Sequence, residues 1–300
     1  MNKFTDLLST FFKGSGVRKP ALPETEDHQE KTESSNEQYV KFFTKDSLIE
    51  ELKAIKERGW IENTLGHSDG VQGDLLEHLL HIPTNNIPIP DASGWELKTQ
   101  KKNTSSAISL SHREPEPRDL GVVRNYLLPT YGWPHQEAGK KYPEGELSLR
   151  LTLNGLTYMD RGFKVRVNRE MQRVEVVFNA DMVSPRHKEW LKGIEENVGL
   201  GPLSVTPYYS FNDLYLSIGR KFYNTFLVRV NTKRENGKEY FLYDEVWVLE
   251  NVDIDKFLEC IEEGKVIIEF DARTGHNHGT KMRMKFKDIP SVYKIVTRVI

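Results

Sequence analysis

Alternation of apolar and polar residues at period two recurs through the second half of the chain, and it limits the fold to one built around β-sheets. Such alternation is typical of strands that bury one face. Asn236-Gly237 separates two of the alternating segments, and this dipeptide favours a two-residue hairpin turn. The alternating segments are 146–153, 163–168, 173–180, 225–234, 239–249, 265–273 and 280–286.

Other segments have the apolar spacing of amphipathic helices. In 44–60, apolar residues recur at helical spacing, Ser47 or Asp46 is the expected N-cap, and Gly59 the expected stop. Pro129 is expected to end the helix that starts after residue 118. We expect 95–102 and 106–112 to be neighbouring strands. The remaining expected helices are 70–82, 185–199, 211–222 and 253–264.

These elements predict a mixed α/β (α+β) fold with a central sheet flanked by helices. No apolar run approaches the roughly 20 residues that a membrane-spanning helix needs, and no signal peptide is apparent, so we expect a cytoplasmic protein. The single cysteine, Cys260, cannot form an internal disulfide and is expected to be a buried thiol in a helix.

Composition and the order of the predicted elements divide the chain into three parts. Residues 1–40 are expected to be a disordered or tethering segment, because they are rich in Pro, Glu, Ser and Thr and carry little to bury. We expect 41–145 to form a catalytic lobe and 146–300 the remainder of the fold. The net charge of −2 gives no sign of a nucleic-acid partner, although the chain after Lys265 is locally basic.

The range 73–98 carries the residues most suited to chemistry. Glu77 lies on a predicted helix among leucines, and Asp91 follows Pro90 at a turn that Gly94 allows to reverse sharply. Glu96 and Lys98 are two apart on a predicted strand, so both point to one face. Charged groups gathered in this way are costly to bury unless they serve a reaction.

Hydrolysis of a phosphodiester bond is a reaction that uses such a set. Clustered carboxylates bind Mg²⁺, which prefers oxygen ligands, lowers the pKa of its bound water and polarises a phosphoryl oxygen. A neighbouring lysine can orient that water and neutralise charge on the phosphate. Glu77, Asp91, Glu96 and Lys98 are therefore the candidate catalytic residues for a reaction of this kind.

Pro90-Asp91, Glu96 and Lys98 resemble the PD-(D/E)XK nuclease motif. With the leucine-flanked Glu77, the pattern is similar to the branch that contains the MutH mismatch-repair nickase and the MvaI/BcnI family of Type II restriction endonucleases. The resemblance implies a restriction-endonuclease-like core, an elaborated second DNA-recognition lobe, and Mg²⁺ bound by Asp91 and Glu96. It also implies a monomer that nicks double-stranded DNA one strand at a time at a short specific site, with a cognate methyltransferase as a possible companion.

The range 270–286 resembles the C-terminal recognition segment of the same family. Arginine can hold the acceptor edge of guanine with two hydrogen bonds, aspartate accepts from cytosine, and histidine donates to acceptors. Glycines at 275 and 279 would allow close approach to a DNA groove. A histidine on the strand after the nuclease motif touches DNA in related enzymes. The expected DNA-contact residues are His112, Asp271, Arg273, His276, His278 and Arg283.

Two alternative functions stay open at this stage. The first is a mismatch-repair nickase that depends on an activating partner, and the second is a DNA-binding protein without catalytic activity. Zinc binding by His276 and His278 is disfavoured, because the sequence offers no partner Cys or His pair at metal-ligand spacing.

Overall fold

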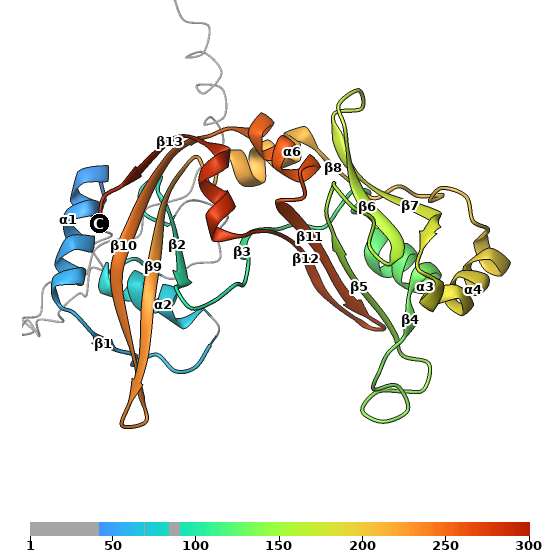
Figure 1. Cartoon of the computed structure of the whole chain (residues 1–300), viewed down its shortest axis with the longest axis horizontal. Coiled ribbons are helices and arrows are strands. Elements are labelled where there is room, and N and C mark those ends of the chain that lie inside the picture. Colours follow the sequence, from blue (N-terminus) through green and yellow to red (C-terminus); the bar gives the residue numbers. More distant parts are fainter. Residues whose placement is uncertain (1–41, 69, 84–90) are drawn as a thin grey trace, which may run out of the picture. The chain divides into compact units, whose positions relative to one another are not determined.

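The computed structural model describes residues 42–68, 70–83 and 91–300. The expectations for residues 1–40 and for Pro90 therefore lie outside the described residues. Helices and strands alternate along the chain in a mixed α/β fold (Figure 1), as the sequence predicts. No helix in these ranges is long and apolar enough to cross a membrane.

A mixed five-stranded sheet carries the predicted catalytic strand. Its order is β1-β10-β9-β2, with β13 also paired to β10. β2 runs parallel to β9, whereas the other pairings are antiparallel. We call it the catalytic sheet, and its strands are β1 (Ile61–Glu62), β2 (Glu96–Lys101), β9 (Asn224–Glu235), β10 (Lys238–Val252) and β13 (Tyr293–Arg298).

β9 and β10 form a long hairpin (Figure 1) around the predicted Asn236-Gly237 turn. Both turn residues have positive φ, 50° and 78°, as a type I′ turn requires. The prediction of 95–102 and 106–112 as neighbouring strands is wrong. β2 pairs with β9, whereas β3 pairs with β12 in another sheet. Each strand therefore has a partner that is distant in sequence, and β2 and β3 do not pair with each other.

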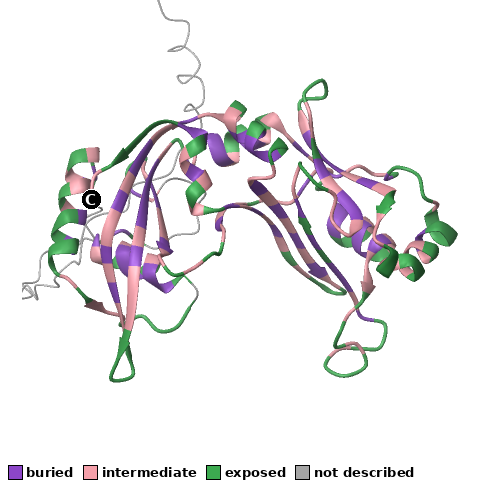
Figure 2. Cartoon of the chain, viewed as in Figure 1, coloured by how far each residue is buried: buried purple, intermediate pink, exposed green. Residues whose placement is uncertain are grey.

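A second five-stranded sheet has the order β3-β12-β11-β5-β4, and all its pairings are antiparallel. We call it the recognition sheet. Buried and partly exposed residues alternate along β11 (Figure 2), so this sheet buries one face and leaves the other polar. Its strands are β3 (Ile108–His112), β4 (Trp133–Pro134), β5 (Leu147–Leu153), β11 (Val266–Arg273) and β12 (His276–Met284).

A third sheet of three strands, β6-β7-β8, packs in the same hydrophobic core as the recognition sheet. The catalytic sheet and the first two helices form another core. Both cores draw residues from before and after residue 145, and the division into lobes at that point stays a prediction. The strands of the third sheet are β6 (Arg161–Asn168), β7 (Arg173–Val183) and β8 (Tyr208–Ser210).

The helices follow the predicted segments with two corrections. α1 is capped by Thr44, which forms a capping box with Ser47, so Ser47 lies at N3 and is not the cap. Pro129 does not end its helix: it occupies the first turn of α3, where its missing N–H costs nothing, and the helix ends before Gly132. Gly59, with φ +71°, follows α1 as expected.

Cys260 is a buried free thiol in α6, as predicted. The helices are α1 (Lys45–Glu57), α2 (Val71–Leu79), the π-helix η1 (Val123–Leu127), α3 (Leu128–Tyr131), the 3-10 helix η2 (Pro185–His187), α4 (Lys188–Val198), α5 (Phe211–Leu214), the π-helix η3 (Tyr215–Gly219), α6 (Ile254–Glu262) and the 3-10 helix η4 (Phe286–Val292).

The N-cap of α6 provides a test of the fold. Asp253 accepts hydrogen bonds from the backbone N–H groups of Asp255 and Lys256, and α6 buries Phe257 and Ile261 in the core. We expect Asp253→Ala to lower the free energy of unfolding by about 1 kcal/mol. The measurement is urea denaturation. Asp255→Ala, which removes an acid of the same helix turn but no cap, should cost less, and an equal loss would contradict the assignment.

Candidate active site

A tight turn brings Asp91 beside the start of β2. Ala92 and Trp95 exchange two backbone hydrogen bonds around Ser93 and Gly94, whose φ values of 49° and 97° permit the reversal. The Asp91 carboxylate then accepts a hydrogen bond of 3.0 Å from the Leu97 backbone N–H. The predicted reversal at Gly94 is confirmed, and Asp91 lies next to the strand that carries Glu96.

Glu96 has the most constrained environment of the predicted catalytic residues. Its side chain is fully buried at the start of β2. Neither of its oxygens accepts a well-oriented hydrogen bond from the described residues. Instead its carboxylate forms ion pairs with the ammonium groups of Lys98 and Lys221, the latter at 3.5 Å. Burial raises the pKa of Glu96; Lys98 opposes this shift and Asp91 adds to it.

Glu77 reaches the site from α2. Burial raises its pKa to about 7, with the charge of Asp91 as the next cause and that of Asp74 after it; Lys98 lowers it. The structure therefore brings the carboxylates of Glu77, Asp91 and Glu96 and the ammonium group of Lys98 close enough to act on one another electrostatically. Their mutual repulsion means that additional positive charge would stabilise the set.

The position of α2 against β2 is set by a close approach at Gly73, which lies one helical turn before Glu77. A Cβ atom at Gly73 would lie 3.1 Å from Thr99 Oγ1, closer than ordinary packing allows. The Tyr243 hydroxyl donates a 2.8 Å hydrogen bond to the Gln72 carbonyl and holds the same turn of α2 against the sheet. The lack of a side chain at Gly73 thus lets α2 present Glu77 close to β2.

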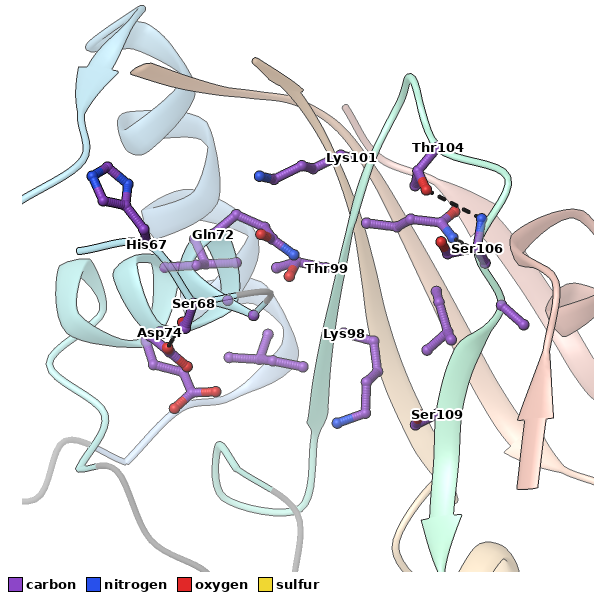
Figure 3. A pocket seen from close by; sticks show the side chains of 18 of the residues that line it. His67, Ser68, Gln72, Asp74, Lys98, Thr99, Lys101, Thr104, Ser106 and Ser109 are labelled. Atoms are coloured by element: carbon purple, nitrogen blue, oxygen red, sulfur yellow. Dashed lines mark hydrogen bonds between the residues drawn. The ribbon is translucent and has the colours of Figure 1, made fainter. Parts of the chain in front are cut away.

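A pocket of about 770 Å³ opens beside these residues. α2 and β3 flank β2, and Lys98 extends from β2 into the space between them (Figure 3). Glu77, Lys98 and Arg283 line this pocket, whereas Asp91 and Glu96 are not among its lining residues. It continues along β2 to Lys101, near His67.

Lys221 is a site residue that the sequence analysis missed. It follows η3, and besides its ion pair with Glu96 its ammonium lies 6.0 Å from the centre of the Phe222 ring, over which Lys98 also lies at 5.5 Å. The basic pair Arg220-Lys221 near the end of the predicted helix 211–222 was the only sequence signal, and it does not distinguish a site lysine from a surface one.

Within the described residues, no group of three or more His, Cys, Asp or Glu side chains is arranged to hold a metal ion. Mg²⁺ needs only one or two carboxylates, because water fills the rest of its coordination sphere. Glu96 and Asp91 fit a site of this kind, because the buried Glu96 oxygens accept no well-oriented hydrogen bond from the described residues and Asp91 lies beside the same strand. These two residues would hold the ion, and the donor atoms are the hard oxygens that it prefers.

His112 and Arg283 lie on paired strands, near the pocket. Burial lowers the pKa of His112, and the charges of Lys281 and Lys221 lower it further; Lys98 acts in the same direction. The Arg283 guanidinium donates to the Ala107 carbonyl, at 2.6 Å from Nη2, and pairs with Glu269 at 3.0 Å.

The other four predicted DNA-contact residues lie at the far end of β11 and β12. Asp271 pairs with Arg150 at 3.2 Å across to β5, and Arg273 pairs with Glu146 at 2.9 Å. His276 and His278 are exposed, with ring nitrogens 3.3 Å apart.

Two solved structures have a similar fold. One, described as a complex of the restriction endonuclease MvaI with its cognate DNA substrate, has a TM-score of 0.67 and 19% identity, covering 86% of this chain and 100% of that chain. The other, MvaI in the absence of DNA, has a TM-score of 0.50 and 19% identity, covering 87% of this chain and 100% of that chain. The fold is therefore that of a restriction endonuclease.

A family model also identifies the family of this chain. The model of the MvaI/BcnI restriction endonuclease family matches residues 49–293, and the chain belongs to that family. It is an endodeoxyribonuclease, as predicted. A search of curated proteins found no match.

The burial of Glu96 leads to a stability test. Burial raises the pKa of Glu96 in spite of its ion pairs with Lys98 and Lys221, so its charged form is destabilising in the folded chain. We therefore expect Glu96→Gln to raise the melting temperature at pH 7 in EDTA, measured by calorimetry. Glu62→Gln is the control: Glu62 is partly exposed and pairs with Lys238 at 2.9 Å, so its loss should give no rise. A Glu96→Gln protein that melts at or below the wild-type temperature would contradict this account.

Proposed function

We propose that this endonuclease is Mg²⁺-dependent and hydrolyses phosphodiester bonds of double-stranded DNA at a short specific sequence. The observation that carries the proposal is the environment of the buried Glu96 carboxylate. It is ion-paired with two lysines, it accepts no well-oriented hydrogen bond from the described residues, and it acts electrostatically with Asp91 and Glu77. A buried set of this composition has a high electrostatic cost unless it binds a cation and a phosphate. The similar MvaI structure is a complex with cognate DNA, which supports DNA as the ligand.

In this proposal Asp91 and Glu96 would hold Mg²⁺. When bound there, the ion would supply a more acidic water and a Lewis acid for a phosphoryl oxygen. Lys98, which points into the pocket, orients the attacking water and donates to the phosphate as negative charge develops on it. Glu77 completes the catalytic set from α2.

Lys221 has a related role in the proposal. Its ammonium shares the Glu96 carboxylate with Lys98. Two ammonium groups at one carboxylate leave positive charge that is available to a second anion. We assign Lys221 to the scissile phosphate, which would lie beside Glu96, where the ammonium groups of Lys98 and Lys221 meet.

Sequence readout is assigned to the recognition sheet. Asp271, Arg273, His276 and His278 are proposed to contact bases or phosphates from β11 and β12, and His112 and Arg283 to contact DNA nearer the catalytic residues. Charge-bearing side chains on a polar sheet face suit the donor and acceptor pattern of the major groove.

The proposal is tested with supercoiled plasmids of varied sequence and the purified full chain. We expect cutting with Mg²⁺ and none with EDTA, without any added partner. As the family resemblance implies a monomer that nicks one strand at a time, open-circular plasmid should accumulate before linear DNA. Plasmids left supercoiled at all Mg²⁺ concentrations would contradict the proposal and favour a partner-dependent nickase or an inactive DNA-binding protein.

Substitutions test the catalytic set. We expect Asp91→Ala and Lys98→Ala to abolish cutting while DNA binding persists, and Lys221→Ala to slow cutting by about 100-fold, as for loss of a charge-stabilising donor. The measurements are single-turnover cleavage and gel shift.

Lys192→Ala is the matched control for the lysine substitutions, because this exposed side chain pairs, among the described residues, with the exposed Glu196 alone, at 3.8 Å. It should cut like wild type. Wild-type rates in Asp91→Ala or Lys98→Ala would remove that residue from its role.

A further inference from the structure

The outward face of the recognition sheet carries the charged residues of β11 and β12. Alternate residues of β11 point inward, including the buried Phe270 and Ala272, which leaves Glu269, Asp271 and Arg273 on the opposite face. These charged side chains are not equally available to a ligand. The two arginines of the face, Arg273 and Arg283, differ in how many of their N–H donors are used within the protein.

Arg283 uses most of its donors within the protein. Its Nε and Nη2 atoms both donate to the Ala107 carbonyl, at 3.2 and 2.6 Å, and Nη1 donates to Glu269. Arg273 differs, because its Nη1 alone is used, donating to Glu146 at 2.9 Å and to the Thr274 carbonyl at 3.4 Å. Its Nε and Nη2 donate to no group within the described ranges.

Two side chains of the loop between β4 and β5 fix the Arg273 guanidinium. Glu146, the ion-pair partner, is only 4% exposed, so its ion pair with Arg273 is shielded from water. The ring of Tyr142 lies against the guanidinium, with its centre 4.5 Å from Cζ. A stacked and ion-paired guanidinium has lost most of its rotational freedom before any ligand arrives.

The backbone joins the same two segments. The Thr274 N–H donates to the Leu147 carbonyl at 3.1 Å, and the Leu147 N–H donates to Thr274 Oγ1 at 3.0 Å. These reciprocal bonds hold the β11–β12 turn to the start of β5. His276, on the other side of the turn, is exposed. The β11–β12 hairpin is therefore attached to β5 through the strand end that carries Arg273.

We infer that Glu146 and Tyr142 are positioning residues that hold the Nε–Nη2 edge of Arg273 toward a guanine in the major groove. The inference rests on the proposed base contact of Arg273 and adds the groups that make it specific. Guanine presents two acceptors, O6 and N7, on this groove edge, and two parallel N–H donors match them. Fixing the guanidinium beforehand removes the entropic cost of ordering it and penalises bases that lack the two acceptors.

The experiment measures base discrimination by binding, so that it does not depend on cleavage. A randomised duplex pool enriched on the full chain with Ca²⁺ gives the preferred sequence. Affinities are then compared for this duplex and for duplexes with each G·C pair replaced by A·T. We expect Arg273→Ala to remove the preference at one G·C pair, and Glu146→Gln and Tyr142→Ala to reduce it there by about tenfold or more.

Further variants separate positioning from a structural role. Tyr142→Phe keeps the ring and should retain wild-type discrimination. In the Arg273→Ala background, Glu146→Gln should change discrimination no further, because it acts through that guanidinium. The matched control is Glu175→Gln: this carboxylate is 2% exposed and pairs with Arg166 and Arg173, away from the recognition sheet. It should lower stability without changing discrimination.

The outcomes distinguish the inference from the proposed function. Unchanged discrimination in both Glu146→Gln and Tyr142→Ala overturns the inference, as does unchanged discrimination in Arg273→Ala, which leaves nothing to position. An equal further loss in the Arg273→Ala background also overturns it. Failure of the wild-type chain to cut plasmid DNA bears on the catalytic proposal alone, because discrimination in binding is measured separately.

Discussion

The burial of one carboxylate is the constraint on which the site depends. Glu96 lies out of water on β2, at the end of the catalytic sheet, and two lysines offset its charge without giving it well-oriented hydrogen bonds. Burial raises the pKa of Glu96 in spite of these ion pairs, so they do not fully offset the cost of burying its charge, and the surrounding fold must supply the remainder. The hairpin of β9 and β10 contributes to that energy, because its Phe226, Val228 and Val248 are fully buried in the core of the catalytic sheet.

The two sheets differ in how far their charged side chains are paired with opposite charges. In the catalytic sheet, like charges are brought together and remain under-compensated, which suits a site that binds a cation and a phosphate. On the recognition sheet, Asp271, Arg273 and Arg283 each have an opposite charge as partner. Such pairing orients side chains and avoids repulsion, while the unused donors of Arg273 keep one edge available. Catalysis and readout thus place different electrostatic demands on one chain.

Local patterns predicted local structure well. The Asn236-Gly237 turn, the reversal at Gly94 and the buried Cys260 are as expected, because each depends on few neighbouring residues. Errors arose where distant partners decide. β2 and β3 are close in sequence but pair in different sheets, and the capping role fell to Thr44 because its hydroxyl, not that of Ser47, accepts from the first turn of α1.

By itself, the sequence determined the spacing of Glu96 and Lys98, the turn after Asp91 and the family to which the chain belongs. These follow from short-range geometry, since residues two apart on a strand share a face whatever surrounds them. Only the tertiary structure decided that Lys221 pairs with Glu96 and that Glu146 holds Arg273. Such contacts join segments far apart in sequence, and they exist because particular strands pair and particular loops close, which no local pattern specifies.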